Sequence, residues 1–284
     1  MRWMITGAKG QLGQDVQKEC RKRGGEVLAS DVSELDITDL PRVREAVRAS
    51  RAQAIVNCSA YNAVDQAETD VESALLVNGI GPRNLAIAAE EQGIPLMHFS
   101  TDYVFDGAQE TPYTIADPPR PISQYGSSKL LGEQEVRALC RRHFVVRLSW
   151  VFGAGNTNFA AKVLEWARGK PELKVVTDQV SCPCYTADLA PAILDLFDCG
   201  AYGLLHLTNQ GFCSRFEWAE HMISLLRWPV RVLPSDGREF PTKARRPAFS
   251  AMNSAPIENI LGRDLPHWKD AVERYLVEVG ALER

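Results

Sequence analysis

Short apolar runs and amphipathic stretches alternate through the first 150 residues of the chain. The runs are nearly continuous in apolar residues, which is typical of buried parallel strands, and the stretches between them repeat apolar residues at helical spacing. We predict strands at residues 2–6, 26–30, 54–58, 95–100 and 144–148, and helices at residues 11–23, 41–50, 71–92 and 123–142. This alternation predicts an α/β fold with a doubly wound parallel sheet, the Rossmann arrangement.

The alternation loosens after Trp150. Helices are predicted at residues 159–168, 187–197 and 214–227, the last with Ser214 and Glu217 spaced as a capping box. Short strands are predicted at 174–177, 204–208 and 230–233, and a loop at 234–259, where Pro, Ser and Arg are frequent. We therefore expect a first domain of residues 1–150 and a smaller lobe made mainly of residues 151–284, with some later segments returning to the main sheet.

Composition narrows the classes of function. The 284 residues are 45% hydrophobic and 24% charged, as in soluble globular proteins, and the net charge of −4 offers no basic surface for nucleic acid. No long apolar run predicts a membrane span, and the chain enters its first strand without a signal peptide. Seven scattered cysteines fit reduced thiols, so a cytoplasmic protein is expected.

A glycine-rich loop follows the first predicted strand. Gly7, Gly10 and Gly13 stand at the turn into the first predicted helix, which is the context that a dinucleotide-binding motif requires. Glycine permits a positive φ in the turn and lets backbone amides approach a pyrophosphate at the helix N-terminus. A tight strand–helix turn without a ligand is the alternative interpretation.

The residues after the second predicted strand bear on the choice of cofactor. Asp31 lies about 20 residues beyond the loop, where an acid accepts hydrogen bonds from the adenosine ribose and favours NAD. Lys9 could instead attract the extra phosphate of NADP. Asp36 and Ile37 fall where a segment could lie against adenine. Either NADH or NADPH is therefore expected.

Tyr125 and Lys129 form a Tyr-x-x-x-Lys pair, which places both side chains on one face of a helix. A lysine ammonium beside a phenol favours the phenolate and is expected to lower the tyrosine pKa. The tyrosine then exchanges a proton with a substrate oxygen while hydride moves at the adjacent carbon, and the lysine is placed to hold the nicotinamide ribose. At the end of the fourth predicted strand, Ser100 or Thr101 offers a hydroxyl to the same oxygen.

Together these motifs make the chain resemble the extended short-chain dehydrogenases/reductases, and within them the dTDP-4-dehydrorhamnose reductases. The resemblance runs nearly end to end. Its most specific pieces are the runs Ala63-Val64-Asp65-Gln66-Ala67-Glu68 and Ser100-Thr101-Asp102-Tyr103-Val104-Phe105, supported by Leu35-Asp36-Ile37-Thr38, Val77-Asn78, Arg147-x-Ser149-Trp150-Val151-Phe152-Gly153 and Thr177-Asp178-Gln179.

The resemblance implies NAD(P)H-dependent reduction of the C4 ketone of dTDP-6-deoxy-L-lyxo-4-hexulose to dTDP-L-rhamnose. It implies a dinucleotide-binding domain at 1–150 and a sugar-nucleotide-binding lobe after it. Tyr125 would be the proton donor, Lys129 its partner and Thr101 the hydroxyl that tunes it, while Thr101, Asp102 and Trp150 would contact the sugar nucleotide. The residues implied to line the cofactor, beyond the three glycines, are Gln11, Leu12, Asp31, Asp36, Ile37, Ala60, Tyr61, Asn62, Tyr125 and Lys129.

Some positions depart from the family pattern. Asn62 stands where threonine or serine is frequent, and Ser181 and Cys184 stand where glycine and threonine are usual. These changes leave the identity of the deoxysugar less defined than the reaction. Arg246, in a basic pair before a proline, is a further candidate for the diphosphate because arginine offers forked hydrogen bonds to phosphate; a solvated charge is the alternative.

The sequence carries only general signals for metal binding and for oligomerisation. Some members of the family hold Mg²⁺ at a dimer interface through clustered glutamates, but Asp188, Glu273 and Glu278 are too generic to place such ligands here. We predict no metal site: a bound Mg²⁺ is compatible with the family but is not predicted from these residues. The protein is expected to be a monomer or a homodimer.

Two other functions share these motifs. Nucleotide-sugar dehydratases have a Thr-Asp-Glu pattern at the end of strand four, whereas Tyr103 occupies the third position of that pattern here. A nucleotide-sugar epimerase would be distinguished by retaining its nicotinamide through turnover. A non-catalytic dinucleotide-binding regulatory subunit would be indicated by loss of Tyr125 or Lys129, and both are present.

Overall fold

The structure, a computed structural model that describes residues 1–283, is built on a six-stranded sheet. The strand order is β10-β5-β4-β3-β1-β2, and every pairing in this sheet is parallel. The strands are β1 (Arg2–Thr6), β2 (Glu26–Ser30), β3 (Ala54–Asn57), β4 (Leu96–Thr101), β5 (His143–Leu148) and β10 (Gly203–His206). The predicted α/β fold with a doubly wound parallel sheet is confirmed.

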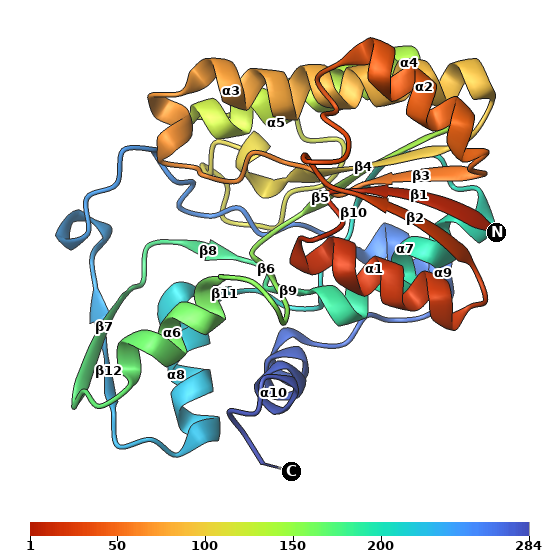
Figure 1. Cartoon of the computed structure of the whole chain (residues 1–284). Helices are drawn as coiled ribbons and strands as arrows, with labels where there is room; N and C mark the ends of the chain where they lie inside the picture. The colour runs from red at the N-terminus through yellow and green to blue at the C-terminus, as the bar shows by residue number, and fades with distance from the viewer. Residues whose placement is uncertain (284) are drawn as a thin grey trace.

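Helices cover both faces of this sheet (Figure 1). One face carries α2 (Leu40–Ser50), α3 (Val71–Leu75), α4 (Gly81–Gln92) and α5 (Gln124–Leu139), and the other carries α1 (Gln11–Lys22), α7 (Thr186–Cys199) and α9 (Ala255–Leu261). Successive strand residues serve opposite faces: Ile5 belongs to the core on the α1 and α7 side, whereas Met4 belongs to the core on the α2 and α4 side. Burial on both faces explains why these strands are apolar without alternation.

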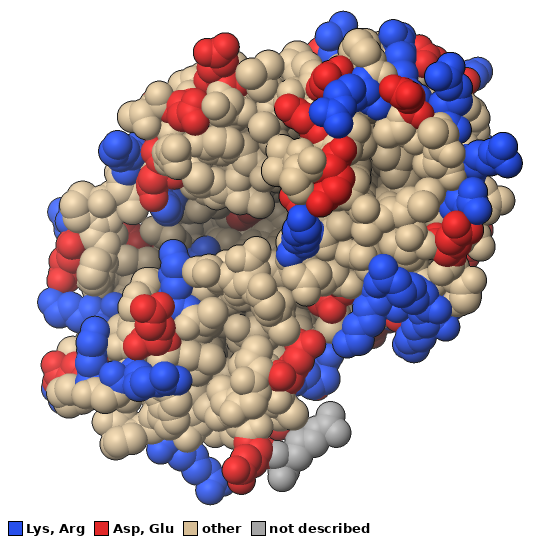
Figure 2. Space-filling model, in the orientation of Figure 1, with Lys and Arg blue, Asp and Glu red and all other residues tan. Residues whose placement is uncertain are grey.

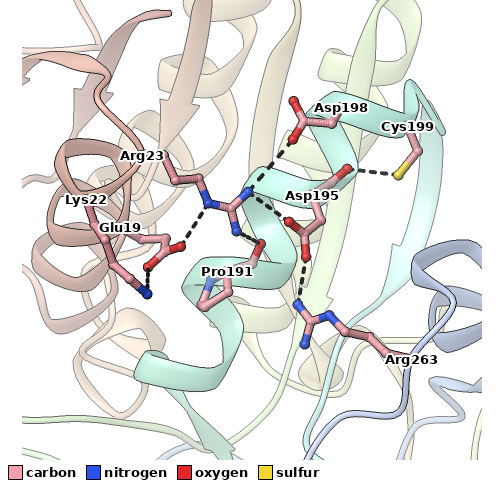
Figure 3. Close-up of polar contacts among 8 residues, drawn as sticks. All are labelled: Glu19, Lys22, Arg23, Pro191, Asp195, Asp198, Cys199 and Arg263. Carbon is pink, nitrogen blue, oxygen red and sulfur yellow. Dashed lines mark hydrogen bonds and ion pairs between the residues drawn. The ribbon is translucent and has the colours of Figure 1, made fainter.

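Segments after residue 151 complete the main sheet and its cover. Strand β10 pairs with β5, and α7 packs beside α1. Polar contacts fix this packing, as Figure 3 shows: Arg23 Nη1 lies 2.8 Å from Asp195 Oδ1, and Arg263 Nη2 lies 2.7 Å from Asp195 Oδ2. Arg23 also donates to the carbonyl of Pro191, inside α7.

A second core lies below the sheet in the view of Figure 1. It joins α6 (Phe159–Ala167), α8 (Arg215–Leu226) and α10 (Trp268–Glu278) to the parallel pair β7 (Glu172–Val176) and β12 (Arg231–Ser235). Trp218 is fully buried in this core, Phe152 packs edge-on against it, and Tyr275 packs edge-on against Phe152. Figure 2 shows a hollow between this part of the molecule and the sheet, with basic side chains near its edge.

The predicted long helix at 71–92 is interrupted. A π-helix, η2 (Leu76–Ile80), separates α3 from α4. Gly79 and Gly81 fall at this point, and an added Cβ at either glycine would lie 2.5 Å from a Leu131 or Ile37 side-chain atom. Periodicity alone does not reveal such an interruption, because apolar spacing continues across it.

Two helices near the end of the chain were not predicted. The segment predicted as a loop at 234–259 contains the last two residues of β12, the 3-10 helix η4 (Gly237–Glu239) and the first five residues of α9, so that prediction was wrong in part. Pro256 stands in the first turn of α9, where proline is tolerated. Helix α10 carries the apolar residues Ala271, Val272, Tyr275 and Leu276, all buried against the second core.

The sequence also missed four short strands, β6 (Val151–Phe152), β8 (Val180–Ser181), β9 (Cys184–Tyr185) and β11 (Cys213–Ser214). Each has only two residues, too few for a period to register.

Candidate active site

The glycine loop forms a compact turn between β1 and α1. Gly7 has φ of +64°, and a Cβ there would lie 2.5 Å from the backbone of Cys58. A Cβ at Gly13 would lie 2.4 Å from the carbonyl oxygen of Gly7, so α1 reaches β1 only with glycine at this position. The sequence motif therefore serves close backbone packing at its first and third glycines.

The second glycine leaves a cradle at the N-terminus of α1. A Cβ at Gly10 would contact only the carbonyl oxygen of Gly7, at 3.3 Å, so a side chain there would fill otherwise open space. In the structure of residues 1–283, Gly10 provides no side-chain cap and no acidic residue occupies the first turn of α1. The partial positive charge of a helix N-terminus is thus available to an anion. These residues fit the pyrophosphate of a dinucleotide.

Asp31 follows β2 and closes over the glycine loop. Its carboxylate accepts hydrogen bonds from the backbone N–H of Lys9 at 3.0 Å and of Val32 at 2.9 Å. Lys9 Nζ lies 3.2 Å from Glu34 Oε1 and donates to Ser33, so its charge is partly neutralised. Hydrogen bonds from Ser33, the Asp31 backbone and Lys9 lower the pKa of Glu34 to about 2. Acidic groups therefore dominate this end of the loop.

Asp36 and Ile37 lie farther along, before α2. The Asp36 carboxylate accepts from the N–H and the hydroxyl of Thr38, within its own turn. The Ile37 side chain is 5% exposed and packs against Gly81 of α4, while its carbonyl accepts from Asn84 Nδ2 at 3.0 Å. The structure places this segment beside α4 with the Ile37 side chain in the core, and its contact with an adenine stays a prediction.

Asn78 fixes the segment Ala60-Tyr61-Asn62, which follows β3. Asn78 Oδ1 accepts from Tyr61 N–H at 2.8 Å, and Asn78 Nδ2 donates to Tyr61 O and to Ser128 Oγ, both at 3.0 Å. Ser128 lies between Tyr125 and Lys129 on α5, so this amide ties the segment to the Tyr/Lys helix. Asn78 belongs to the π-helix η2, a form often found at functional sites. Sequence reasoning assigned it no role, although Val77-Asn78 was part of the resemblance.

Helix α5 presents Tyr125 and Lys129 at the carboxyl end of β4. Ser123 caps the helix by accepting from Gly126 N–H at 3.1 Å. A Cβ at Gly126 would lie 2.2 Å from the carbonyl oxygen of Tyr103, so glycine allows the helix to approach the strand end. Lys129 is 3% exposed, and its Nζ donates to the carbonyl of Phe99 at 2.6 Å.

The pKa values of the pair differ from the expectation. Burial raises the pKa of the Tyr125 phenol, an effect that the nearby Thr101 hydroxyl reduces. Burial lowers the pKa of Lys129 to about 8, against the opposing charge of Glu133. The expected lowering of the tyrosine pKa by the lysine was wrong for this structure, because burial has the largest effect and the charges that act on the phenol, those of Asp102 and Tyr103, raise its pKa further. A raised pKa keeps the phenol protonated, as a proton donor requires.

Thr101 and Asp102 end β4 in a closed hydrogen-bond network. The Thr101 hydroxyl donates to Asp102 Oδ1 and accepts from the backbone N–H of Tyr103, both at 3.1 Å. Asp102 Oδ2 accepts from Ser250 at 2.6 Å and from Ser181 at 3.0 Å. Asp102 is 2% exposed and all these partners are protein groups, so the structure orients its carboxylate toward Thr101 and the two serines. Ser181 and Ser250 were not predicted to have this role.

Trp150 adopts φ of +41°, which a bulky residue adopts only at a cost. The guanidinium carbon of Arg215 lies 3.6 Å from the centre of the Trp150 ring, and the Trp218 ring stacks with that indole at 5.8 Å. Part of the indole surface predicted to contact the sugar nucleotide is therefore covered by Arg215.

A cavity of about 770 Å³ lies next to this aromatic group. Arg215 lines it, together with residues of α6, of β7 and of the segment before β8. Arg246 lines it too, and Arg246 Nη1 and Nη2 lie 3.1 and 2.9 Å from the two carboxylate oxygens of Asp65. Asp65 belongs to the run 63–68 that carried much of the resemblance, so this ion pair joins that run to the lining of the cavity.

The structure brings most of the predicted residues to the carboxyl edge of the sheet. The glycine loop, residues 60–62, Thr101, Asp102, Tyr125 and Lys129 follow β1, β3 and β4 or face them from α5. Gln11 is joined to the second core, because Asn158 Nδ2 donates to Gln11 Oε1 at 3.1 Å; Leu12, beside it, packs against the main core. Asn62 makes no side-chain hydrogen bond to the protein among residues 1–283, and its role stays a prediction.

No group of three or more His, Cys, Asp or Glu side chains within residues 1–283 is arranged to hold a metal ion. Two of the acids considered above are engaged with other side chains: Asp188 Oδ1 lies 2.7 Å from Arg274 Nη1, and Glu278 accepts from the Tyr185 hydroxyl at 2.6 Å. In the same described part of the chain, no helix is both long and apolar enough to cross a membrane.

Comparison with known proteins identifies one sequence family and several similar proteins. The sequence family described as "RmlD substrate binding domain" matches residues 1–280. A dTDP-4-dehydrorhamnose reductase of Mycobacterium tuberculosis (strain H37Rv) is 39% identical over 278 residues, which cover 95% of this chain and 91% of the relative.

Solved structures of proteins with the same name are also similar to this chain. A dTDP-4-dehydrorhamnose reductase from Clostridium acetobutylicum superposes with a TM-score of 0.95 at 38% identity, covering 99% of this chain and 100% of that chain. The enzyme of the same name from Bacillus anthracis, solved in complex with NADP, gives 0.94 at 38% identity, covering 98% and 99%.

Proposed function

This chain belongs to the RmlD substrate-binding-domain family, and from that membership and the geometry of its site we propose that it is a dTDP-4-dehydrorhamnose reductase. It reduces the C4 ketone of dTDP-6-deoxy-L-lyxo-4-hexulose to the alcohol of dTDP-L-rhamnose, with NADPH or NADH as the reductant. The observation that carries the proposal is the placement of Tyr125 and Lys129 beside Thr101 at the carboxyl end of β4.

The glycine loop and the N-terminus of α1 would hold the cofactor pyrophosphate, with Asp31 over the loop and residues 60–62 beside α5. A bound reduced nicotinamide supplies the hydride that reaches C4 of the sugar. The protein supplies the proton. Tyr125 donates it from Oη to the carbonyl oxygen as negative charge develops there, and Thr101 holds the phenol by a hydroxyl that Asp102 orients.

Lys129 stabilises the phenolate that Tyr125 becomes. Its ammonium is buried, with one hydrogen bond to Phe99 O that fixes its position. A cation in a site of low dielectric constant acts strongly on a nearby developing anion. Glu133, on the next turn of α5, favours the protonated lysine.

The site disfavours dehydration, which needs a carboxyl acid–base group beside the threonine. Tyr103 occupies the position at which dehydratases carry the glutamate of the Thr-Asp-Glu pattern. It is 9% exposed, and its ring packs edge-on against that of Tyr125, with the ring centres 5.8 Å apart. Asp102 already accepts hydrogen bonds on both carboxylate oxygens. Reduction needs a proton donor but no second acid–base group, and Tyr125 is that donor.

The test combines the protein with dTDP-4-keto-6-deoxyglucose, a 3,5-epimerase and either NADH or NADPH. Loss of the reduced-nicotinamide absorbance with formation of dTDP-L-rhamnose supports the proposal and identifies the cofactor. Conversion of a sugar nucleotide by the protein alone, with the 3,5-epimerase and the reduced nicotinamide left out, would point to an epimerase instead. Binding of the cofactor without any turnover would point to a regulatory subunit.

A further inference from the structure

Arg215 is the first residue of α8 and points into the cavity of about 770 Å³. The capping box formed by Ser214 and Glu217 fixes the start of this helix, as their spacing predicted. The backbone N–H of Arg215 also donates to Gln179 O at 3.2 Å. The position of the residue is therefore set by the fold before any ligand binds.

Aromatic rings hold the guanidinium. Its central carbon lies 3.6 Å from the centre of the Trp150 ring, 4.5 Å from that of Phe159 and 5.6 Å from that of Trp218. Cation–π contacts of this kind orient an arginine while leaving its N–H donors free in the plane of the group.

Arg215 forms no ion pair with residues 1–283, and the Asp102 carboxylate acts on its charge only from beyond contact distance. Its Nη1 is buried and has no hydrogen-bond partner among residues 1–283. Among the other cations that line the cavity, Arg246 is paired with Asp65 and Lys174 with Glu239, whereas Lys162 and Lys170 form no ion pair within residues 1–283 and lack the aromatic rings that hold Arg215. Burial lowers the pKa of Arg215 to about 10, so the group is still a cation at neutral pH. A partly buried cation whose Nη1 has no hydrogen-bond partner is destabilising unless an anion compensates it.

We propose that Arg215, held by Trp150 and Phe159, is the main residue that binds the diphosphate of the nucleotide-sugar substrate. The inference rests on the proposed function for the identity of the substrate. The same cavity is lined by Trp166 and Phe240, two exposed aromatic rings suited to the nucleoside. Trp150 acts on the diphosphate through Arg215, as a positioning residue.

The test measures binding of dTDP by calorimetry to wild type, Arg215→Met, Arg215→Lys and Arg168→Met. Methionine keeps an unbranched apolar side chain and removes the donors. We expect the Kd of dTDP to rise about 10- to 100-fold in R215M, the effect of losing charge-assisted hydrogen bonds. R215K keeps the charge but not the fork, so its Kd should lie between those values and that of wild type. R168M removes an equal charge at an exposed site outside the cavity and should bind as wild type does.

Two further measurements separate a binding role from a structural one. Thymidine, which has no phosphate, should bind R215M as it binds wild type. Without ligand, R215M should unfold at the same or a higher temperature than wild type, because an unpaired charge has been removed. An unchanged Kd for dTDP, an equal weakening of thymidine binding, or a marked fall in unfolding temperature would each overturn the assignment.

The outcome is separable from that for the proposed function, because dTDP binding needs no turnover. A wild-type protein that binds dTDP through Arg215 but oxidises neither NADH nor NADPH would refute the reaction alone. An active wild type whose R215M variant binds dTDP normally would refute the role of Arg215 alone.

Discussion

Tyr125 lies where burial raises the pKa of its phenol, and Thr101 is the protein group that opposes this effect. At neutral pH the residue is therefore a protonated acid, and only the oxygen of a ketone receiving hydride is basic enough to take its proton. This environment suits reduction. The same residue pair would need a deprotonated phenol to begin the reverse reaction.

Replacing Tyr125 with phenylalanine removes the proton donor and little else, because the ring still packs edge-on against Tyr103. We expect turnover to fall by at least about 100-fold, the usual contribution of general acid catalysis. Binding of NADH or NADPH, followed by fluorescence titration, should change little. A variant with wild-type kcat would exclude Tyr125 as the donor.

Lys129 sets an upper limit on the working pH. Its pKa, lowered to about 8 by burial, means that the ammonium is lost as pH rises through this value. The protonated form stabilises the phenolate, so kcat/KM, which reports the free enzyme, should fall about tenfold per unit above pH 8. The Tyr125 pKa is too high to produce this limb. A profile that falls only near the ordinary lysine value of 10.5 would contradict the assignment.

At the scale of elements, α5 positions the site because it lies unusually close to its neighbours. A Cβ at Gly132 would lie 2.2 Å from the carbonyl oxygen of Asn78, the residue that holds Tyr61 and Ser128. The helix and the π-helix η2 can keep this distance only with glycine at the contact.

Gly132→Ala is therefore expected to destabilise the protein by about 1–3 kcal/mol, the range for overpacked sites, although alanine favours a helix. Thermal unfolding measures the change. The matched control is Gly79→Ala, whose Cβ would meet the end of the Leu131 side chain, which can move; its effect should be smaller. If G132A unfolds at or above the wild-type temperature, the close approach does not constrain α5.

Sequence and structure agree best where local pattern decides the outcome. Strands β1, β3, β4 and β5 were predictable because each is a mainly apolar run buried in the sheet, whereas β2 lies at the sheet edge and is only partly buried. The glycine loop and Tyr125–Lys129 were predictable because their spacing reflects local geometry. The capping box at Ser214 was predictable for the same reason.

Whole-molecule features were not predictable in this way. The cavity is lined by residues from 157–179, Arg215 and 240–246, which only the tertiary fold brings together. The pairing of Asp65 with Arg246, 181 positions later, is invisible to periodicity. The tyrosine pKa was predicted with the wrong sign because the sequence shows the lysine but not the loss of water around the phenol.

The central claim for the molecule is direct hydride transfer to C4 of a dTDP-linked ketosugar. The most direct test supplies reduced cofactor carrying deuterium at C4 of the nicotinamide, on each face in separate reactions, and locates the label in the product by NMR. We predict one deuterium at C4 of the sugar of dTDP-L-rhamnose, from one of the two labelled faces. Product without deuterium from either face, or with deuterium at another carbon, would contradict the account.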